Sequence, residues 1–242
     1  YQLTTLTWNK DLVHLIGVNG GPMLGQRSRI SNNASAAALA PMVNVTANGC
    51  QFANLEILQG TPASGPTSIA LQVTGQRNSF INCQISGMAD LTGVADVSGS
   101  RSLKVSGSEN FFKHCYIGLD TVIRATMAEE VEISAGARNI FEDCVFASYT
   151  SLSTFKAVAI GTAVDRFVRF VNCTFYTAES ITSAVAPTGA IGMTTINGQV
   201  QVIQPAVFGY ALLSTGGNTS IKVLTFQNAT TVQGLGTSAA AS

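Results

Sequence analysis

A pattern of about fifteen residues recurs along the middle of this chain, and it constrains the fold more than any other feature. Four copies run apolar-polar-apolar, then a small residue, and then a segment centred on a Phe that a Cys or an aliphatic residue follows three positions later; the last copy, at Phe170, keeps only the second half. The Phe anchors are separated by 28, 32, 29 and 29 residues; they are Phe52, Phe80, Phe112, Phe141 and Phe170. Self-similarity at a period of this length is the signature of a stacked array of repeats.

Each copy has the residue pattern of short strands joined by a tight corner. The alternation in Leu71-Gln72-Val73 is typical of a β-strand. Two residues after the Phe, every copy has Asn, His or Asp, the non-glycine residues that best tolerate a left-handed backbone. These corner residues are Asn54, Asn82, His114, Asp143 and Asn172. We expect them to have positive φ and to bend the strand, so that the Phe and the Cys side chains both point inward.

The sequence therefore predicts an all-β fold, a right-handed parallel β-helix (a solenoid) with a less regular C-terminal β region. Coils stacked at the strand spacing of ~4.8 Å place each Phe over the next Phe. They also stack four interior cysteines, namely Cys83, Cys115, Cys144 and Cys173, and a polar column of Asn78, Asn110 and Asn139. The pattern contains no amphipathic helical segment, which disfavours α/β repeats.

The predicted organisation has three parts. Residues 1–176 form the parallel β-helix with its N-terminal coil, residues 177–227 continue or cap it, and residues 228–242 form a flexible tail. Insertions at 59–68, 87–101 and 118–130 are expected to leave the same side of successive coils, where solenoids carry binding surfaces.

Composition narrows the class of partner. Only 11% of the residues are charged, with 13 Lys and Arg against 13 Asp and Glu, and there is no basic stretch. Nucleic-acid binding is disfavoured because phosphate contacts need clustered cations. No apolar run reaches the ~20 residues of a membrane span. The low charge fits a surface that other subunits cover, and it equally fits a solenoid core that needs little charge. No signal peptide is visible, and because the chain begins at Tyr1 we expect that something upstream was removed or lies outside this sequence.

The cysteines predict reduced, buried thiols rather than a disulfide framework. A column of parallel Cys side chains holds the Cβ atoms too far apart for a disulfide without distortion, and a metal site needs converging ligands. Reduced thiols suit a protein assembled in the cytoplasm. We therefore expect no cofactor and no metal.

No convincing active site is found among the titratable residues. Hydrolysis of a polysaccharide would need two or three carboxylates close together. The candidates are Asp90, Asp96, Asp120, the group Glu129, Glu130 and Glu132, and Asp165. We expect structural roles for each of them: Glu132 in a surface pair with Lys104, and Asp120 in a turn or cap. The available cations, Arg124, Arg138, Arg166 and Arg169, have no acidic cluster opposite, and His14 and His114 are the only histidines.

Two segments carry a resemblance to a known class of proteins. Residues 110–121, with Phe112, His114 and Cys115, and residues 138–146, with Phe141 and Cys144, resemble predicted β-helix proteins of tailed bacteriophages. The segment Leu15-Ile16-Gly17-Val18 looks like the first coil of pectate-lyase-like phage proteins. The resemblance implies a virion protein that accompanies the major capsid protein, and it carries over no catalytic residue.

The leading interpretation is a non-enzymatic virion protein that decorates or cements the capsid, as a homotrimer that contacts the major capsid protein or another virion protein. The alternative is a tailspike or glycan-binding β-helix domain, with or without polysaccharide-degrading activity. Exposed aromatic residues on one face would favour glycan binding, and Trp8, Tyr116, Tyr149 and Tyr176 are available. A cellular pectin-active enzyme is the third and least favoured interpretation.

Overall fold

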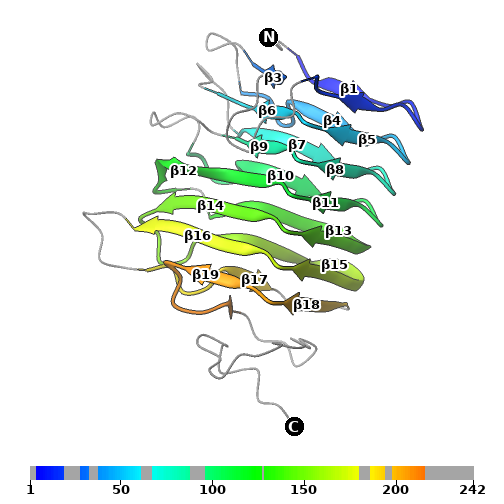
Figure 1. Ribbon diagram of the computed structural model, residues 1–242. Helices are drawn as coiled ribbons and strands as arrows, with labels where there is room; N and C mark the ends of the chain where they lie inside the picture. Colours follow the sequence, from blue (N-terminus) through cyan, green and yellow to red (C-terminus); the bar gives the residue numbers. More distant parts are fainter. Residues whose placement is uncertain are drawn as a thin grey trace.

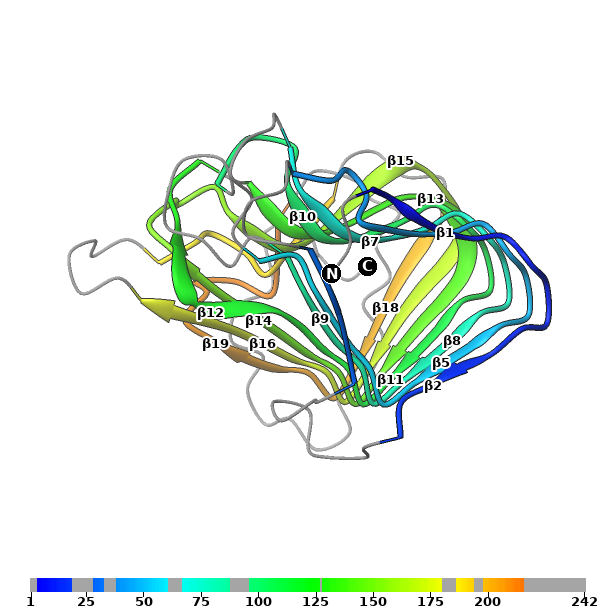
Figure 2. The same ribbon diagram turned by 90° about the horizontal axis from the view of Figure 1, so that it is seen from above.

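The chain winds into a parallel β-helix in which every strand pairing is parallel and the described residues contain no helix (Figure 1). This computed structural model describes residues 4–18, 28–32, 38–60, 67–87, 96–126, 128–179, 186–193 and 198–215. Seen from the N-terminal end, the chain turns clockwise as it recedes from the viewer, so the solenoid is right-handed (Figure 2). The predicted fold class is confirmed.

Three faces build each coil, and the strands of one face stack on one another along the axis. The first face consists of β1 (Leu6–Trp8), β4 (Val43–Val45), β7 (Ile69–Val73), β10 (Arg101–Val105), the first halves of β13 (Glu129–Glu142) and β15 (Lys156–Val171), β17 (Ile191–Met193) and β20 (Ser214–Thr215). The second face consists of β2 (Leu15–Ile16), β5 (Gln51–Ala53), β8 (Ser79–Ile81), β11 (Phe111–Lys113), the second halves of β13 and β15, and β18 (Gln199–Ile203). Because β13 and β15 run through the bend, these two faces form one 13-stranded sheet.

The third face is a separate 7-stranded sheet. It consists of β3 (Arg29–Ser31), β6 (Glu56–Leu58), β9 (Gln84–Ser86), β12 (Tyr116–Arg124), β14 (Val145–Thr150), β16 (Thr174–Glu179) and β19 (Ala206–Phe208). The expected insertions at 59–68 and 87–101 fall between the third face and the first, and their residues 61–66 and 88–95 lie outside the described residues. The insertion at 118–130 was placed too early, because β12 continues as a strand to Arg124. Strands β17 to β20 carry the stack on to Thr215, and the expected tail at 228–242 lies outside the described residues.

A column of five Phe rings fills the interior behind the second face. The ring centroids of Phe52, Phe80, Phe112, Phe141 and Phe170 follow one another at 4.9, 4.8, 4.6 and 5.2 Å, with interplanar angles of 14° or less. All five side chains are buried. This geometry follows from the register, since Phe80 and Phe141 both align with Phe112 on neighbouring strands. Offset ring pairs at this distance contribute about 0.5–1.5 kcal/mol each beyond burial.

The corner residues have the backbone that the sequence predicts. Their φ values lie between 51° and 56°; the residues are Asn54, Asn82, His114, Asp143 and Asn172. Gln204, with φ of 51°, continues the column one coil further. Directly after four of these corners, Cys83, Cys115, Cys144 and Cys173 are buried as free thiols. Cys115 Sγ, for example, lies 3.4 Å from the carbonyl oxygen of Phe80 in the preceding coil, and burial raises the pKa of this thiol.

An asparagine ladder ties the coils together at the corner between the first and second faces. The backbone N–H of Asn78 donates to Oδ1 of Asn110, and that of Asn110 donates to Oδ1 of Asn139, both at 3.0 Å. The side-chain amide of Asn110 donates back to the carbonyl of Gly75. A Cβ on Gly107 would lie 1.8 Å from the same carbonyl oxygen, so this close approach requires glycine.

Candidate functional site

Charged side chains on the outside of the solenoid pair with the coil above or below. The residues just before the ladder asparagines form a second left-handed column, in which Arg77, Glu109 and Arg138 have φ between 56° and 60°. Arg77 Nε donates to Glu109 Oε2 at 2.5 Å, and Arg138 donates to the other oxygen of the same carboxylate. The two guanidinium groups hold the pKa of Glu109 below its ordinary value. Arg138 therefore has one acidic partner, Glu109, although no acidic cluster lies opposite it in the sequence.

The largest group of ionisable side chains lies on the first face, near the corner where the insertions leave. Arg101 Nη2 donates to Glu129 Oε1, and Arg101 Nε lies 3.5 Å from Glu132 Oε2. Glu132 also pairs with Lys104 at 3.2 Å, as the sequence predicts. Burial raises the pKa of Glu129, and Arg101 only partly offsets this effect. Further along the face, burial lowers the pKa of Lys156, whose Nζ donates to Thr188 Oγ1.

Behind this group lie two fully buried charged residues. Arg124 and Glu130 have no exposed area. Glu130 Oε1 accepts a hydrogen bond from Ser102 Oγ, and Arg124 Nη2 donates to the carbonyl of Gly87 at 3.3 Å. Glu130 Oε2 and Arg124 Nε and Nη1 have no partner within the described residues. Burial raises the pKa of Glu130 and lowers that of Arg124.

The structure therefore divides the predicted group of three glutamates. Glu129 and Glu132 flank one guanidinium on the outside, whereas Glu130 is sealed inside. The sequence showed no acidic cluster opposite Arg124, whereas in the structure two carboxylates, those of Glu130 and Asp96, act electrostatically on it. The sequence could not show this burial, because the register of β12 shifts between Leu119 and Arg124 and breaks the alternation from which side-chain direction is inferred.

The remaining candidates have individual structural roles. Asp96 Oδ2 accepts the backbone N–H groups of Ala125 and Thr126. Asp120 lies within β12 rather than in a turn, and its carboxylate, after burial, raises the pKa of Tyr116. Asp165 is exposed and lies 3.9 Å from Arg166.

The other polar candidates also contact neighbouring coils. His114 Nε2 lies 3.2 Å from Asp143 Oδ2 along the corner column. His14 Nδ1 accepts the backbone N–H of Gln51. Arg169 Nε donates to Gln201 Oε1 at 2.8 Å. Asp90 lies outside the described residues.

The chemistry open to the outer cluster is limited by its own ion pairs. Retaining glycoside hydrolases hold two carboxyl groups ~5–5.5 Å apart with the scissile bond between them. Here the guanidinium of Arg101 lies between Glu129 and Glu132, in the space that a glycosidic bond would need. Glu130 has a raised pKa, but its carboxyl is shut off from solvent. Among the described residues, no group of three or more His, Cys, Asp or Glu side chains could hold a metal ion. The same part of the chain has no helix long and apolar enough to cross a membrane.

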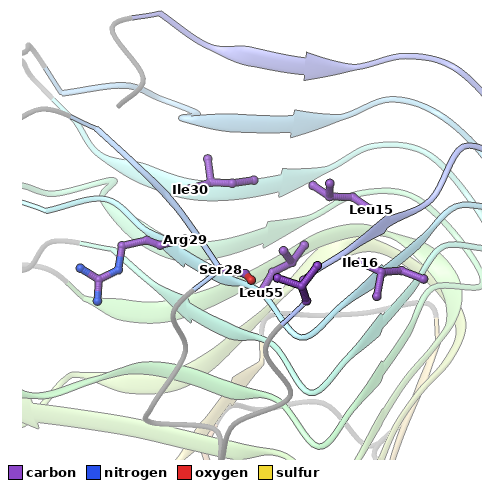
Figure 3. Close-up of a pocket in the computed structure, with 8 residues that line it drawn as sticks. Leu15, Ile16, Ser28, Arg29, Ile30 and Leu55 are labelled. Atoms are coloured by element: carbon purple, nitrogen blue, oxygen red, sulfur yellow. The ribbon is translucent and has the colours of Figure 1, made fainter.

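A pocket of about 300 Å³ opens at the N-terminal end of the solenoid, away from these ionisable groups. Leu15 and Ile30 stand on its two sides with Leu55 between them, and Arg29 points away from it (Figure 3). Its lining is mainly aliphatic, so it offers contact to apolar groups rather than a reacting centre.

Comparisons with known proteins give the fold and little more. No family model matches the chain, and no curated protein is significantly similar to it. A solved structure of a mutant pectin methylesterase in complex with a hexasaccharide matches with a TM-score of 0.50 and 16% identity. The match covers 88% of this chain and 70% of that chain. At this level of identity the likeness shows a shared β-helix fold, the fold of a polysaccharide-acting enzyme, and carries over no residue.

Proposed function

We propose that this chain is a non-enzymatic structural protein of a bacteriophage particle, which decorates or cements the capsid as a β-helical homo-oligomer. The observation that carries the proposal is that the charged side chains form ion pairs between successive coils. From Arg77 through Glu109 to Arg138, and from Arg101 to Glu129 and Glu132, they connect one coil to the next. Groups that a reaction would need free are engaged in holding a rigid rod together.

Three further features support this role. The segments 110–121 and 138–146 resemble β-helix proteins of tailed phages, as described above. A chain with 11% charged residues suits a surface that neighbouring subunits cover. Buried free thiols at five positions suit assembly in the reducing cytoplasm of a host. The partners that fit are further copies of this chain, as a homotrimer in closed cyclic symmetry, and the major capsid protein.

A glycan-binding domain of the tailspike type is the second candidate. Two observations favour it: Tyr149 and Tyr176 are half-buried on the neighbouring strands β14 and β16 of the third face, and the fold is shared with an enzyme solved with a hexasaccharide. Tyrosine rings on a flat sheet are suited to contact with sugar rings. Tyr116, on the same face, is buried and unable to contribute in this way.

An activity screen separates the structural role from an enzymatic one. The full chain is incubated with uronate-rich, methyl-esterified and neutral polysaccharides, and chain cleavage and methanol release are measured. We expect neither. The proposal is wrong if turnover is sustained and is lost in Glu129→Gln or Glu132→Gln but retained in Glu142→Gln. Glu142 is a matched control, since it is paired with Lys113 at 2.6 Å on another face.

A binding assay separates the structural role from the glycan-binding one. The same polysaccharides are immobilised and the full chain is passed over them. Retention that disappears in Tyr176→Ala and survives in Phe111→Ala would establish the second candidate, because Phe111 is a half-buried aromatic residue on β11, in the other sheet. No retention is the result that the structural role predicts.

A further inference from the structure

The two ends of the solenoid differ in how far their apolar residues are buried. At the C-terminal end, Val200 and Val202 are buried although β18 pairs only with β15 among the described strands. Tyr210 and Leu213, which follow the last coil, are buried there as well and belong to the hydrophobic core. The chain thus covers this end with its own residues.

The N-terminal end is open and apolar. Among the described residues, four of the five exposed large hydrophobic side chains belong to the first coil; they are Leu12, Val13, Ile16 and Val18, with 72%, 44%, 58% and 101% of their area exposed. The fifth is Phe208, near the other end. Exposed apolar residues gathered in one place mark interaction sites on soluble proteins.

The pocket at this end has a cause in the sequence. In later coils, only a corner residue and the Cys separate the second face from the third, as Asn82 and Cys83 do between β8 and β9. The side chain three residues after the Phe then fills the interior at the corner. In the first coil, Val18 and Ser28 flank nine further residues instead. The pocket lies at this corner of the first coil, above Leu55 and between Leu15 and Ile30.

We propose that this end binds a second copy of the same chain, head to head, about a twofold axis. Each copy offers a projection, the fully exposed Val18, directly beside a recess of about 300 Å³ lined by Leu15, Ile30 and Leu55. In an isologous contact the projection of one copy enters the recess of the other, and the reverse contact follows by symmetry.

The backbone at this end supports the same contact. Among the described strands, β1, β2 and β3 each pair with one neighbour, β4, β5 and β6 respectively. Their outer edges have no strand partner in that part of the chain, and edges of this kind readily pair with a strand of another chain. About a twofold axis, β2 meets its equivalent in the antiparallel sense, which allows regular ladder hydrogen bonds.

Charge agrees with an identical partner, and area sets a requirement on the contact. The four exposed side chains present on the order of 400 Å² of apolar surface per copy, within the range of about 300–600 Å² of the largest apolar patch on a typical monomer, which is often functional. Two such patches give about 800 Å², so the recesses and strand edges around them must add at least about 400 Å² to reach the roughly 1,200–2,000 Å² that specific complexes bury. Lys10 and Asp11 are neighbours of opposite sign, and Arg29 is paired with Glu56 at 2.5 Å. Identical ends can therefore meet without net repulsion between like charges.

The contact is tested by the mass of the full chain in solution, measured by sedimentation velocity across micromolar concentrations. We expect a mass that halves on dilution. Val18→Lys and Ile16→Lys should each raise the dissociation constant of the pair more than tenfold, because the first would bring an ammonium group into an apolar recess and the second would place one on the apolar patch beside it. Phe208→Lys is the matched control at the covered end, and we expect it to leave the constant unchanged. Unaltered thermal melting of all three variants shows that the fold is intact.

The possible outcomes decide the proposal independently of any role in a phage particle. A mass that Val18→Lys and Ile16→Lys leave unchanged overturns it, whether that mass is a monomer or a trimer. A trimer whose mass is the same in both variants would point instead to solenoids packed side by side. An engineered cysteine gives the orientation: because β2 meets its equivalent about the twofold axis, Ile16→Cys in a head-to-head pair predicts a disulfide between the two copies, detected in a mixture of isotope-labelled and unlabelled chains. A concentration-dependent pair without that link also overturns the proposal.

Discussion

Truncation of the central ring of the Phe column, Phe112→Ala, tests the energetic basis of coil stacking. Phe112 is buried and lies between Phe80 and Phe141, with centroid distances of 4.8 and 4.6 Å. A buried aromatic side chain removes on the order of 150–250 Å² from water. Because most of this area is lost on truncation, the transfer loss alone is about 3 kcal/mol at about 25 cal/mol per Å².

The two ring pairs add about 1–3 kcal/mol, and partial collapse of the neighbouring rings into the cavity offsets part of this loss. We therefore expect Phe112→Ala to lower the free energy of unfolding by about 4 kcal/mol, within the range of about 3–5 kcal/mol for such truncations. The matched control is Phe111→Ala. Phe111 is adjacent on β11, but it alternates to the outer side of the second face and is only half-buried. We expect it to cost about 1 kcal/mol.

The free energy of unfolding of both variants is measured by urea denaturation at neutral pH. Far-UV circular dichroism follows the strands. The fluorescence of Trp8, whose ring lies 5.5 Å from that of Phe52, follows the N-terminal coil. Repeat arrays can lose cooperativity, so the two transitions must coincide before a single free energy is assigned. Equal losses in Phe112→Ala and Phe111→Ala, or a loss below about 1 kcal/mol in Phe112→Ala, would refute the reasoning.

Three further predictions concern single residues. Asn82→Gly should cost little and Asn82→Val at least about 1 kcal/mol more in urea unfolding, because a φ of 51° strains a β-branched residue; equal losses would contradict this. Asn110→Ala should cost about 2–4 kcal/mol in the same assay, since it removes an acceptor for Asn78 and a donor to Gly75 inside the protein; a neutral result would show that the ladder contributes nothing. Burial raises the pKa of Glu130, so its contribution to stability is fully present below the unfolded pKa of about 4.3 and is lost as the pH rises through the higher native pKa. Glu130→Gln should therefore flatten the loss of stability on this rise, as measured by melting temperature against pH, and an unchanged profile would contradict the assignment.

Much of the fold follows from the sequence because the repeat fixes the register. Aligning Phe80 with Phe112 determines which residues of those two coils lie next to each other in the strands and at the corners, where Asn82 aligns with His114. The same alignment could have predicted the ion pair between Arg77 and Glu109, since these two residues directly precede the ladder asparagines in successive copies. The sequence therefore contained the signal for the ion pairs between coils, although only the structure brought it out.

The buried pair and the open end could not be predicted in this way. Gly118 has a φ of 102°, and the register of β12 shifts beyond it, so alternation no longer tells which side Arg124 faces. Burial of Glu130 depends on how this irregular strand passes over β13, and tertiary packing alone decides that. The pocket above Leu55 lies in the first coil, whose sequence departs from the repeat, so the repeat pattern could not predict it.

The most direct test of the proposed structural role is the copy number of this chain in purified phage particles, determined by quantitative mass spectrometry against the major capsid protein. A decoration or cement protein covers a lattice, so this role predicts a copy number in fixed, near-stoichiometric proportion to the capsid protein. Removal of tails from the particles should leave that proportion unchanged. A copy number on the scale of a tail fibre or spike, lost with the tails, would contradict the account and favour the glycan-binding alternative.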